Sequence, residues 1–120
     1  MSYNPRMDFW ASFGAVLMFL AVALGAFAAH GLKSRLTPEM LTIFETGVRY
    51  QVYHALGLLA LAALRGPDKA GWCFVGVIAL FSGSLYLLAL SGEKRLGMIT
   101  PVGGVLFLAG WVLFALKPRG

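Results

Sequence analysis

Three long uncharged runs constrain this chain more than any other feature of its sequence. They cover residues 9–29, 70–90 and 98–116, and none of them contains Asp, Glu, Lys or Arg. A helix needs about 20 apolar residues to cross the hydrocarbon core of a bilayer. With 59% hydrophobic residues and a mean hydropathy of +0.78, the chain is too apolar for a soluble domain. We therefore predict an all-α membrane protein.

A fourth span is predicted from a weaker pattern. Residues 48–64 are purely apolar only after His54, and this segment reaches full length only if it begins near Phe44. We therefore predict a single membrane domain over residues 1–120, folded as a four transmembrane helix bundle. The expected spans are residues 9–30, 44–64, 70–91 and 98–116.

The residues before the second span predict a helix start. Thr37 precedes Pro38 and Glu39, which gives a hydroxyl cap, a proline at the first helical position and an acid in the first turn. Residues 36–47 are therefore expected to be helical. They either lie at the membrane interface before the chain bends at Gly47, or continue into the second span as one long tilted helix.

A signal peptide is the alternative for the first run, because "AFAAHG" at residues 26–31 offers a small-residue cleavage pattern. The apolar regions of signal peptides have about 7 to 15 residues and follow a basic segment. This run has 21 residues and only Arg6 before it, so we interpret it as a retained span. The single cysteine, Cys73, has no partner for an internal disulfide.

Four crossings place both termini on one side of the membrane with loop 65–69; we call this the terminal side. The loops 31–44 and 91–97 lie on the other side, the loop side. The terminal side carries five Lys or Arg residues and the loop side four or five, so the positive-inside rule barely selects an orientation. We expect cytoplasmic termini, and dual insertion stays open. The net charge of +5 comes from scattered residues, which favours lipid head groups over nucleic acid as the partner.

The segment "ETGVRYQVYHAL", residues 45–56, is the most polar part of any predicted span. At a rise of 1.5 Å per residue, Glu45 lies at the loop-side boundary, Arg49 roughly 7 Å inside it and His54 near the middle. The residues that share one half of this helix, at about 100° per residue, are Glu45, Arg49, Tyr50, Tyr53 and His54. Gln51 is the exception, and we expect it to face a neighbouring helix or subunit.

Most other polar groups of the predicted spans also lie in the loop-side half, which predicts a polar pocket there. Its candidate residues are His30, Glu45, Arg49, Tyr50, Tyr53, His54, Ser82, Ser84, Tyr86 and Thr100. In this pocket Arg49 would pair with an anionic ligand or have a structural role, and Glu45 would be its partner. Tyr50, Tyr53 and His54 would form a wall of hydrogen-bonding groups. Such a pocket would bind or pass a small polar or anionic solute, a proton or a lipid head group.

The alternative is a structural or accessory membrane protein. In that case the same polar network only fixes the fold, and the outer surface packs on a partner. The expected partners are therefore the lipid bilayer, a small polar ligand or lipid, and a second copy of the chain in a homo-oligomer. Small residues expected to allow close helix packing are Gly25, Gly47, Gly83 and Gly104. Tryptophans expected to form an aromatic belt on the terminal side are Trp10, Trp72 and Trp111.

Neither a metal site nor an enzyme is predicted. His30 and His54 are the only histidines, and they are roughly 15 Å apart along the membrane normal, too far to share an ion. The sequence has no nucleophile elbow, no carboxylate pair on one helix face and no phosphate-binding glycine loop. We therefore expect no catalytic residue and no cofactor.

Four motifs carry a resemblance to a known family. They are "GAFAAHGL" (25–32), "FETGVRYQVYHALGLL" (44–59), "FSGSLYLLAL" (81–90) and "TPVGG" followed by "GW" (100–111). In this order the chain resembles the small membrane proteins of the domain of unknown function 423 family, whose animal relatives are called transmembrane protein 256. The family commonly reads Gly where this chain has Ala28. The resemblance implies a multi-pass protein of the bacterial inner membrane with four spans, and it supplies no function.

Overall fold

The computed structural model describes residues 4–116, and this part of the chain is helical, with no strand. The α-helices are α1 (Pro5–Phe27), α2 (Pro38–Leu64), α3 (Asp68–Val77), α4 (Gly83–Ser91) and α5 (Thr100–Leu116). A π-helical turn, Ala28–Leu32, extends α1, and a second, Ile78–Ser82, joins α3 to α4 without a break. A 3-10 turn, Lys94–Met98, precedes α5. The predicted all-α class is confirmed.

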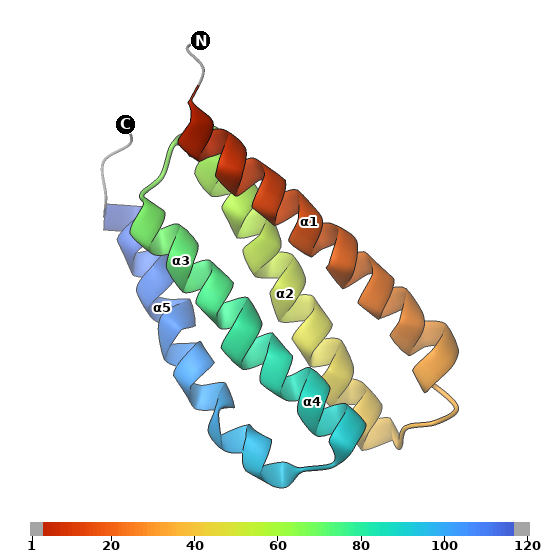
Figure 1. Ribbon diagram of the computed structural model, residues 1–120. Coiled ribbons are helices and arrows are strands. Elements are labelled where there is room, and N and C mark those ends of the chain that lie inside the picture. Colours follow the sequence, from red (N-terminus) through yellow and green to blue (C-terminus); the bar gives the residue numbers. More distant parts are fainter. Residues whose placement is uncertain (1–3, 117–120) are drawn as a thin grey trace.

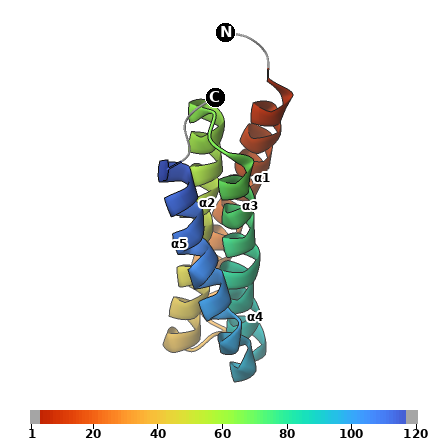
Figure 2. The ribbon, with the colours of Figure 1, turned by 90° about the vertical axis from the view of Figure 1, so that its left-hand side faces the viewer.

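The helices run alternately up and down, and they form a thin, open bundle rather than a closed square (Figure 1). Helix α1 packs along α2, α2 packs against α3 and α4, and α5 packs along α3, whereas α1 and α5 make no extensive contact. The described backbone measures 49 × 27 × 16 Å. Figure 2 shows α2 on the opposite side of this thin body from α3 and α4. One side of α2 is therefore left without a covering helix.

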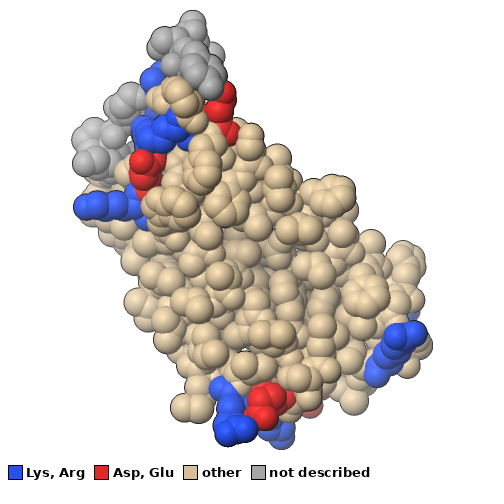
Figure 3. Space-filling model, viewed as in Figure 1, with Lys and Arg blue, Asp and Glu red and all other residues tan. Residues whose placement is uncertain are grey.

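Three helical segments are long and apolar enough to cross a membrane: Pro5–Leu32, Asp68–Ser91 and Lys94–Leu116. Helix α2 has 27 residues but is not among them, because polar side chains lower the hydropathy of its first half. On the face in Figure 3 the charged side chains lie at the two ends of the bundle, with an uncharged band between them. The structure thus supports three of the four predicted spans by length and composition.

Helix α2 begins where the sequence predicts. The Thr37 side chain accepts a hydrogen bond from the Met40 amide (3.2 Å), and Pro38 is the first helical residue. The helix is then α-helical without interruption to Leu64, including at Gly47. Of the two arrangements open from the sequence, the structure has the single long helix. Gly47 serves close packing instead of a bend, since a Cβ atom there would lie 2.7 Å from the Tyr86 ring.

Hydrogen bonds to Asp68 join two helices at the terminal end of the bundle. The Asp68 carboxylate accepts hydrogen bonds from the Arg6 guanidinium and from the Trp10 indole N–H, both at 2.8 Å, and so ties α3 to α1. Trp10 is only 1% exposed. The predicted aromatic belt is therefore wrong for Trp10, because its indole packs on Gly71, where a Cβ atom would come within 2.6 Å of the ring.

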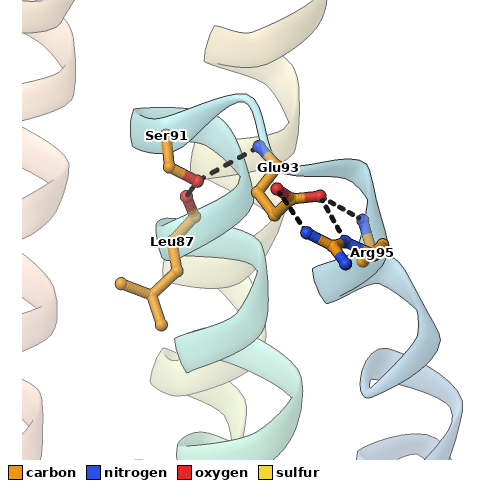
Figure 4. Close-up of polar contacts among 4 residues, drawn as sticks. All are labelled: Leu87, Ser91, Glu93 and Arg95. Atoms are coloured by element: carbon orange, nitrogen blue, oxygen red, sulfur yellow. Dashed lines mark hydrogen bonds and ion pairs between the residues drawn. The ribbon is translucent and has the colours of Figure 1, made fainter.

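The loop end is closed by local contacts between α4 and the 3-10 turn (Figure 4). The Ser91 hydroxyl donates to the Leu87 carbonyl and accepts from the Glu93 amide. The Glu93 carboxylate accepts from the Arg95 side chain at 3.1 Å and from its backbone amide. These hydrogen bonds hold the pKa of Glu93 below its usual value. The loop is therefore ordered by short-range polar contacts.

Candidate functional site

The ten predicted site residues do not form one pocket. The structure divides most of them between a buried network inside the bundle and an exposed stripe on the outer side of α2. The buried or partly buried members are Tyr50, His54, Ser82, Ser84, Tyr86 and Thr100. The exposed members are His30, Glu45, Arg49 and Tyr53. The two groups have different chemistry.

Gln51 is the centre of the buried network. The residue is 3% exposed, and its side-chain amide donates to the Leu17 carbonyl of α1 (2.9 Å) and accepts from the Tyr86 hydroxyl of α4 (2.6 Å). One helical turn before Gln51, the Gly47 carbonyl accepts a hydrogen bond from the buried Ser82 hydroxyl at 2.6 Å. Three helices are therefore joined by hydrogen bonds that start from one side of α2.

A second part of the network joins α4 to α5. The hydroxyls of Ser84 and Thr100 are 2.7 Å apart, and Ser84 also donates to the Phe81 carbonyl (2.9 Å). The backbones come close nearby, because a Cβ atom on Gly103 would lie 2.6 Å from the Phe81 amide nitrogen. The hydroxyl pair thus stands where small residues let the two helices approach.

His54 is fully buried, and both of its ring nitrogens are used. The Trp111 indole N–H donates to Nε2 (3.1 Å), and Nδ1 lies 2.8 Å from the Tyr50 carbonyl. Because an indole can only donate, Nε2 must be the unprotonated nitrogen, so Nδ1 carries the hydrogen and donates to the carbonyl. The rings of Phe74 and Phe107 enclose the imidazole, with centroids 5.5 and 4.7 Å away. His54 is therefore a neutral, packed residue with no nitrogen free for a ligand.

Side chains of the α3–α4 segment pack closely on two glycines of α2. The Tyr86 ring lies against Gly47, and a Cβ atom on Gly57 would lie 3.1 Å from the Phe74 ring. Two surface grooves are present, but apolar and aromatic residues line them and the predicted site residues do not. One follows α1 between Ala15 and Ala26, and the other lies between Ala60 of α2 and Trp111 of α5.

The exposed stripe is what we call the open face of α2. Its residues, spaced three or four apart, are Thr42, Glu45, Arg49, Tyr53 and Leu56. Glu45 and Arg49 form no ion pair with each other, and within residues 4–116 neither side chain has a hydrogen-bonding partner. Tyr53 is 48% exposed. The predicted Glu45–Arg49 pair is therefore not formed, and both side chains are exposed.

The other predicted residues lie away from both groups. His30 is exposed in the π-helical turn that ends α1. A Cβ atom on Gly25 would make an ordinary contact of 3.5 Å with Val48, and one on Gly83 would lie 3.8 Å from the Ile78 carbonyl. A Cβ atom on Gly104 would meet no atom of another element within 4 Å. The close approach to the α3–α4 segment is at the preceding residue, Gly103, because that side of α5 faces the bundle.

Two residues of the network were missed by sequence reasoning. The helical phase of Gln51 predicts that it faces a neighbouring helix. Nothing in the sequence spacing indicates its two hydrogen-bonding partners. The sequence predicts Trp111 in an interfacial belt, yet its indole N–H donates to His54, 57 positions away. No local sequence signal reports a pairing over that distance.

The comparisons with known proteins settle the family. The family described as "Protein of unknown function (DUF423)" matches residues 24–104. The chain belongs to this family. The matched region contains α2 and the α3–α4 segment, and so all of the open face, but it ends before Trp111.

The relatives are bacterial proteins named as membrane proteins. UPF0382 membrane protein SH2409 of Staphylococcus haemolyticus is 42% identical over 92% of this chain and 95% of its own length. UPF0382 membrane protein YwdK of Bacillus subtilis is 45% identical over 86% of this chain and 89% of its own. A UPF0382 membrane protein of Haemophilus influenzae is 46% identical over 81% and 82%. No solved structure matches the chain. The predicted family and the membrane class are confirmed.

Proposed function

We propose that this chain is a four-span protein of the bacterial inner membrane that binds, and passes, a small solute carrying an anionic oxygen group. In this proposal the solute binds on the open face of α2 and not inside the bundle. Arg49 is the main contact, Tyr53 supplies a hydroxyl, and the termini face the cytoplasm. The role is binding rather than catalysis.

The position of α2 supports its role as the fourth span. It packs along α1 and along the α3–α4 segment, and both of these are long and apolar enough to cross a membrane. A helix of 27 residues is about 40 Å long, more than the roughly 30 Å of a hydrocarbon core. Its low hydropathy is acceptable, because its buried polar side chains are hydrogen-bonded to neighbouring helices.

The single observation that carries the proposal is the position of Arg49. Gly47 lies level with Ser82, since the two are hydrogen-bonded, and Ser82 is nine residues from the loop end of α4 at Ser91. Arg49 is two residues deeper than Gly47 and about 17 Å from that end, which on this proposal puts it near the middle of a hydrocarbon core about 30 Å thick. An unpaired Arg there costs about 3 kcal/mol on insertion scales and marks a functional site by default.

The chemistry of the open face fits an anionic oxygen group. A guanidinium presents five N–H donors in a planar fork that matches phosphate or carboxylate oxygens. Tyr53, one turn further along α2, adds a phenolic hydroxyl, and its ring packs edge-on against Tyr50 with centroids 5.4 Å apart. Tyr50 in turn packs on Phe107 of α5. The wall of the face is therefore held by aromatic contacts while Arg49 stays exposed.

The test uses two phosphate-bearing probes and one matched control. Thermal unfolding of the purified protein in detergent is measured with increasing inorganic phosphate and, separately, with increasing short-chain phosphatidylglycerol. We expect one probe to raise the melting temperature in the wild type and in Arg95→Gln, and the rise to disappear in Arg49→Gln. A shift with free phosphate alone identifies a solute site, and a shift with the lipid alone identifies a head-group site. Equal shifts in Arg49→Gln and wild type would remove Arg49 from the proposal.

A structural or accessory role is the second candidate, and the buried network favours it. Gln51, His54 and Ser82 are hydrogen-bonded to other groups of the same chain, as expected of residues that only fix helix register. On this alternative, neither probe shifts the melting temperature. Substitutions in the network would then reduce stability, and substitutions on the open face would change only partner binding.

A further inference from the structure

We propose that a second copy of this chain covers the open face of α2, in a parallel two-fold dimer in which Arg49 of each copy pairs with Glu45 of the other. This inference rests on the same face as the proposed function, because it names what closes that site. It requires no bound solute, so the two ideas can fail separately.

The open face needs a cover of some kind. It carries a cation near the middle of the membrane and a carboxylate about 6 Å, or one helical turn, nearer the loop end. Lipid chains cannot solvate either group. Within the described residues no helix shields them, since α1 and α5 lie at opposite edges of a body whose backbone is only 16 Å thick.

A second copy satisfies both charges at once. In a two-fold dimer the same patch meets itself, so each contact occurs twice. Glu45 and Arg49 lie on the contact stripe, and the flexible arginine side chain can extend along the helix to a carboxylate one turn away. Two reciprocal ion pairs result. A lipid phosphate over the same face would pair with Arg49 but leave Glu45 without a partner and beside another negative charge.

Helix geometry favours parallel over antiparallel copies. An antiparallel pair would bring Glu45 level with Arg49 only if its two-fold axis passed near Gly47. The midpoint of α2 is Gln51, four residues further along, so the two copies would be displaced by about 12 Å along the membrane normal. Their apolar bands would then not lie in one bilayer. Parallel copies keep the bands level.

The dimer leaves room for the proposed site. Each guanidinium has five N–H donors, and a bidentate pair with the carboxylate of the other copy uses two of them. Tyr53 and Leu56 continue the contact toward the terminal side. A solute would then bind between the copies, in contact with arginine but shielded from lipid.

The first test is disulfide cross-linking in native membranes, with no ligand added. In a Cys73→Ala background, Tyr53→Cys and Leu56→Cys are oxidised and compared with Phe19→Cys on α1 and Leu87→Cys on α4. The control positions are as exposed or more so, at 72% and 58%. We expect covalent dimers from the two open-face positions at least fivefold more abundant than from the controls. Equal yields at all four positions, or no dimer at any, would overturn the proposal.

The second test separates pairing between copies from any role within one chain. Glu45→Arg gives a copy with two cations on the face, and Arg49→Glu gives a copy with two anions. When the two variants are co-expressed with different tags, the mixed dimer has two complementary pairs, whereas each homodimer has only repulsive ones. We expect the mixed dimer to exceed the statistical share severalfold. Random pairing would refute the Arg49–Glu45 contact, while a confirmed dimer that shows no probe shift would refute only the proposed function.

Discussion

The Gln51 side chain offers the sharpest test of the buried network. It bridges α2 to α1 through the Leu17 carbonyl (2.9 Å) and to α4 through the Tyr86 hydroxyl (2.6 Å). Substitution of Gln51 by Leu keeps the approximate volume and removes both bonds. It also leaves the partly buried Tyr86 hydroxyl without its acceptor. The expected result is a less stable but still membrane-inserted protein.

The magnitude follows from hydrogen bonds measured between membrane helices. Each contributes about 0.6 kcal/mol on average and about 1.7 kcal/mol at most. Loss of two bonds should therefore lower the free energy of unfolding by about 1 to 3 kcal/mol. The lower end is expected because Leu gains apolar contacts that the amide lacks.

A double-mutant cycle isolates the Gln51–Tyr86 bond from these other effects. Unfolding is followed by circular dichroism during titration of mixed micelles with a denaturing detergent. The four proteins are the wild type, Gln51→Leu, Tyr86→Phe and the double variant. We expect a coupling energy of about 0.6 to 1.7 kcal/mol. Tyr53→Phe, which removes an exposed hydroxyl from the same helix, is the control and should stay within about 0.5 kcal/mol of the wild type.

Two results would refute the reasoning. A coupling energy below about 0.3 kcal/mol, within the usual error of additivity, would mean that the 2.6 Å contact contributes nothing between these residues. A Gln51→Leu variant more stable than the wild type would mean that the network is retained for function and not for the fold. Either outcome would weaken the structural alternative.

Three further predictions concern other contacts. Gly103→Ala should destabilise the protein by about 1 to 3 kcal/mol, because overpacking forces two backbones apart. Gly104→Ala should be neutral or stabilising by up to about 1 kcal/mol, because alanine has the higher helix propensity. Thermal unfolding of the two variants measures the difference. Nitrogen NMR should find the proton of the His54 ring on Nδ1, and Trp111→Phe should change the Nε2 signal, since that atom loses its donor. Asp68→Asn should cost about 1 kcal/mol in unfolding free energy, less in high salt, because the ion pair is half exposed.

Each of these has a control or a contrary result. Equal stability of the two glycine variants would contradict the close approach of α5 to the α3–α4 segment. An Nε2-protonated His54 in the wild type would contradict the indole contact. The control for Asp68→Asn is Glu93→Gln, which removes an exposed carboxylate that has only local partners. This control should leave the unfolding free energy within about 0.5 kcal/mol of the wild type.

The candidate site shows how far helical phase can be taken from one sequence. Phase correctly separated Gln51 from Glu45 and Arg49. It could not tell which of the two sides meets the other helices, because an amphipathic pattern has the same period whether its polar stripe faces inward or outward. In a chain this apolar the usual guide, polar residues outward, does not hold either. The predicted pocket therefore combines the exposed stripe with part of the buried network.

The sequence by itself determined the membrane class, the helical elements, the start of α2 at Pro38 and the family, because these depend on local composition and on motif order. The tertiary structure alone decided that Gln51, His54 and Ser82 are bonded within the bundle while Arg49 is not. Those bonds join residues 34, 57 and 35 positions apart, and they form only where small residues let particular helices approach. The contrast between satisfied interior groups and an unpaired charge on the open face of α2 is thus a property of packing, which no local pattern reports.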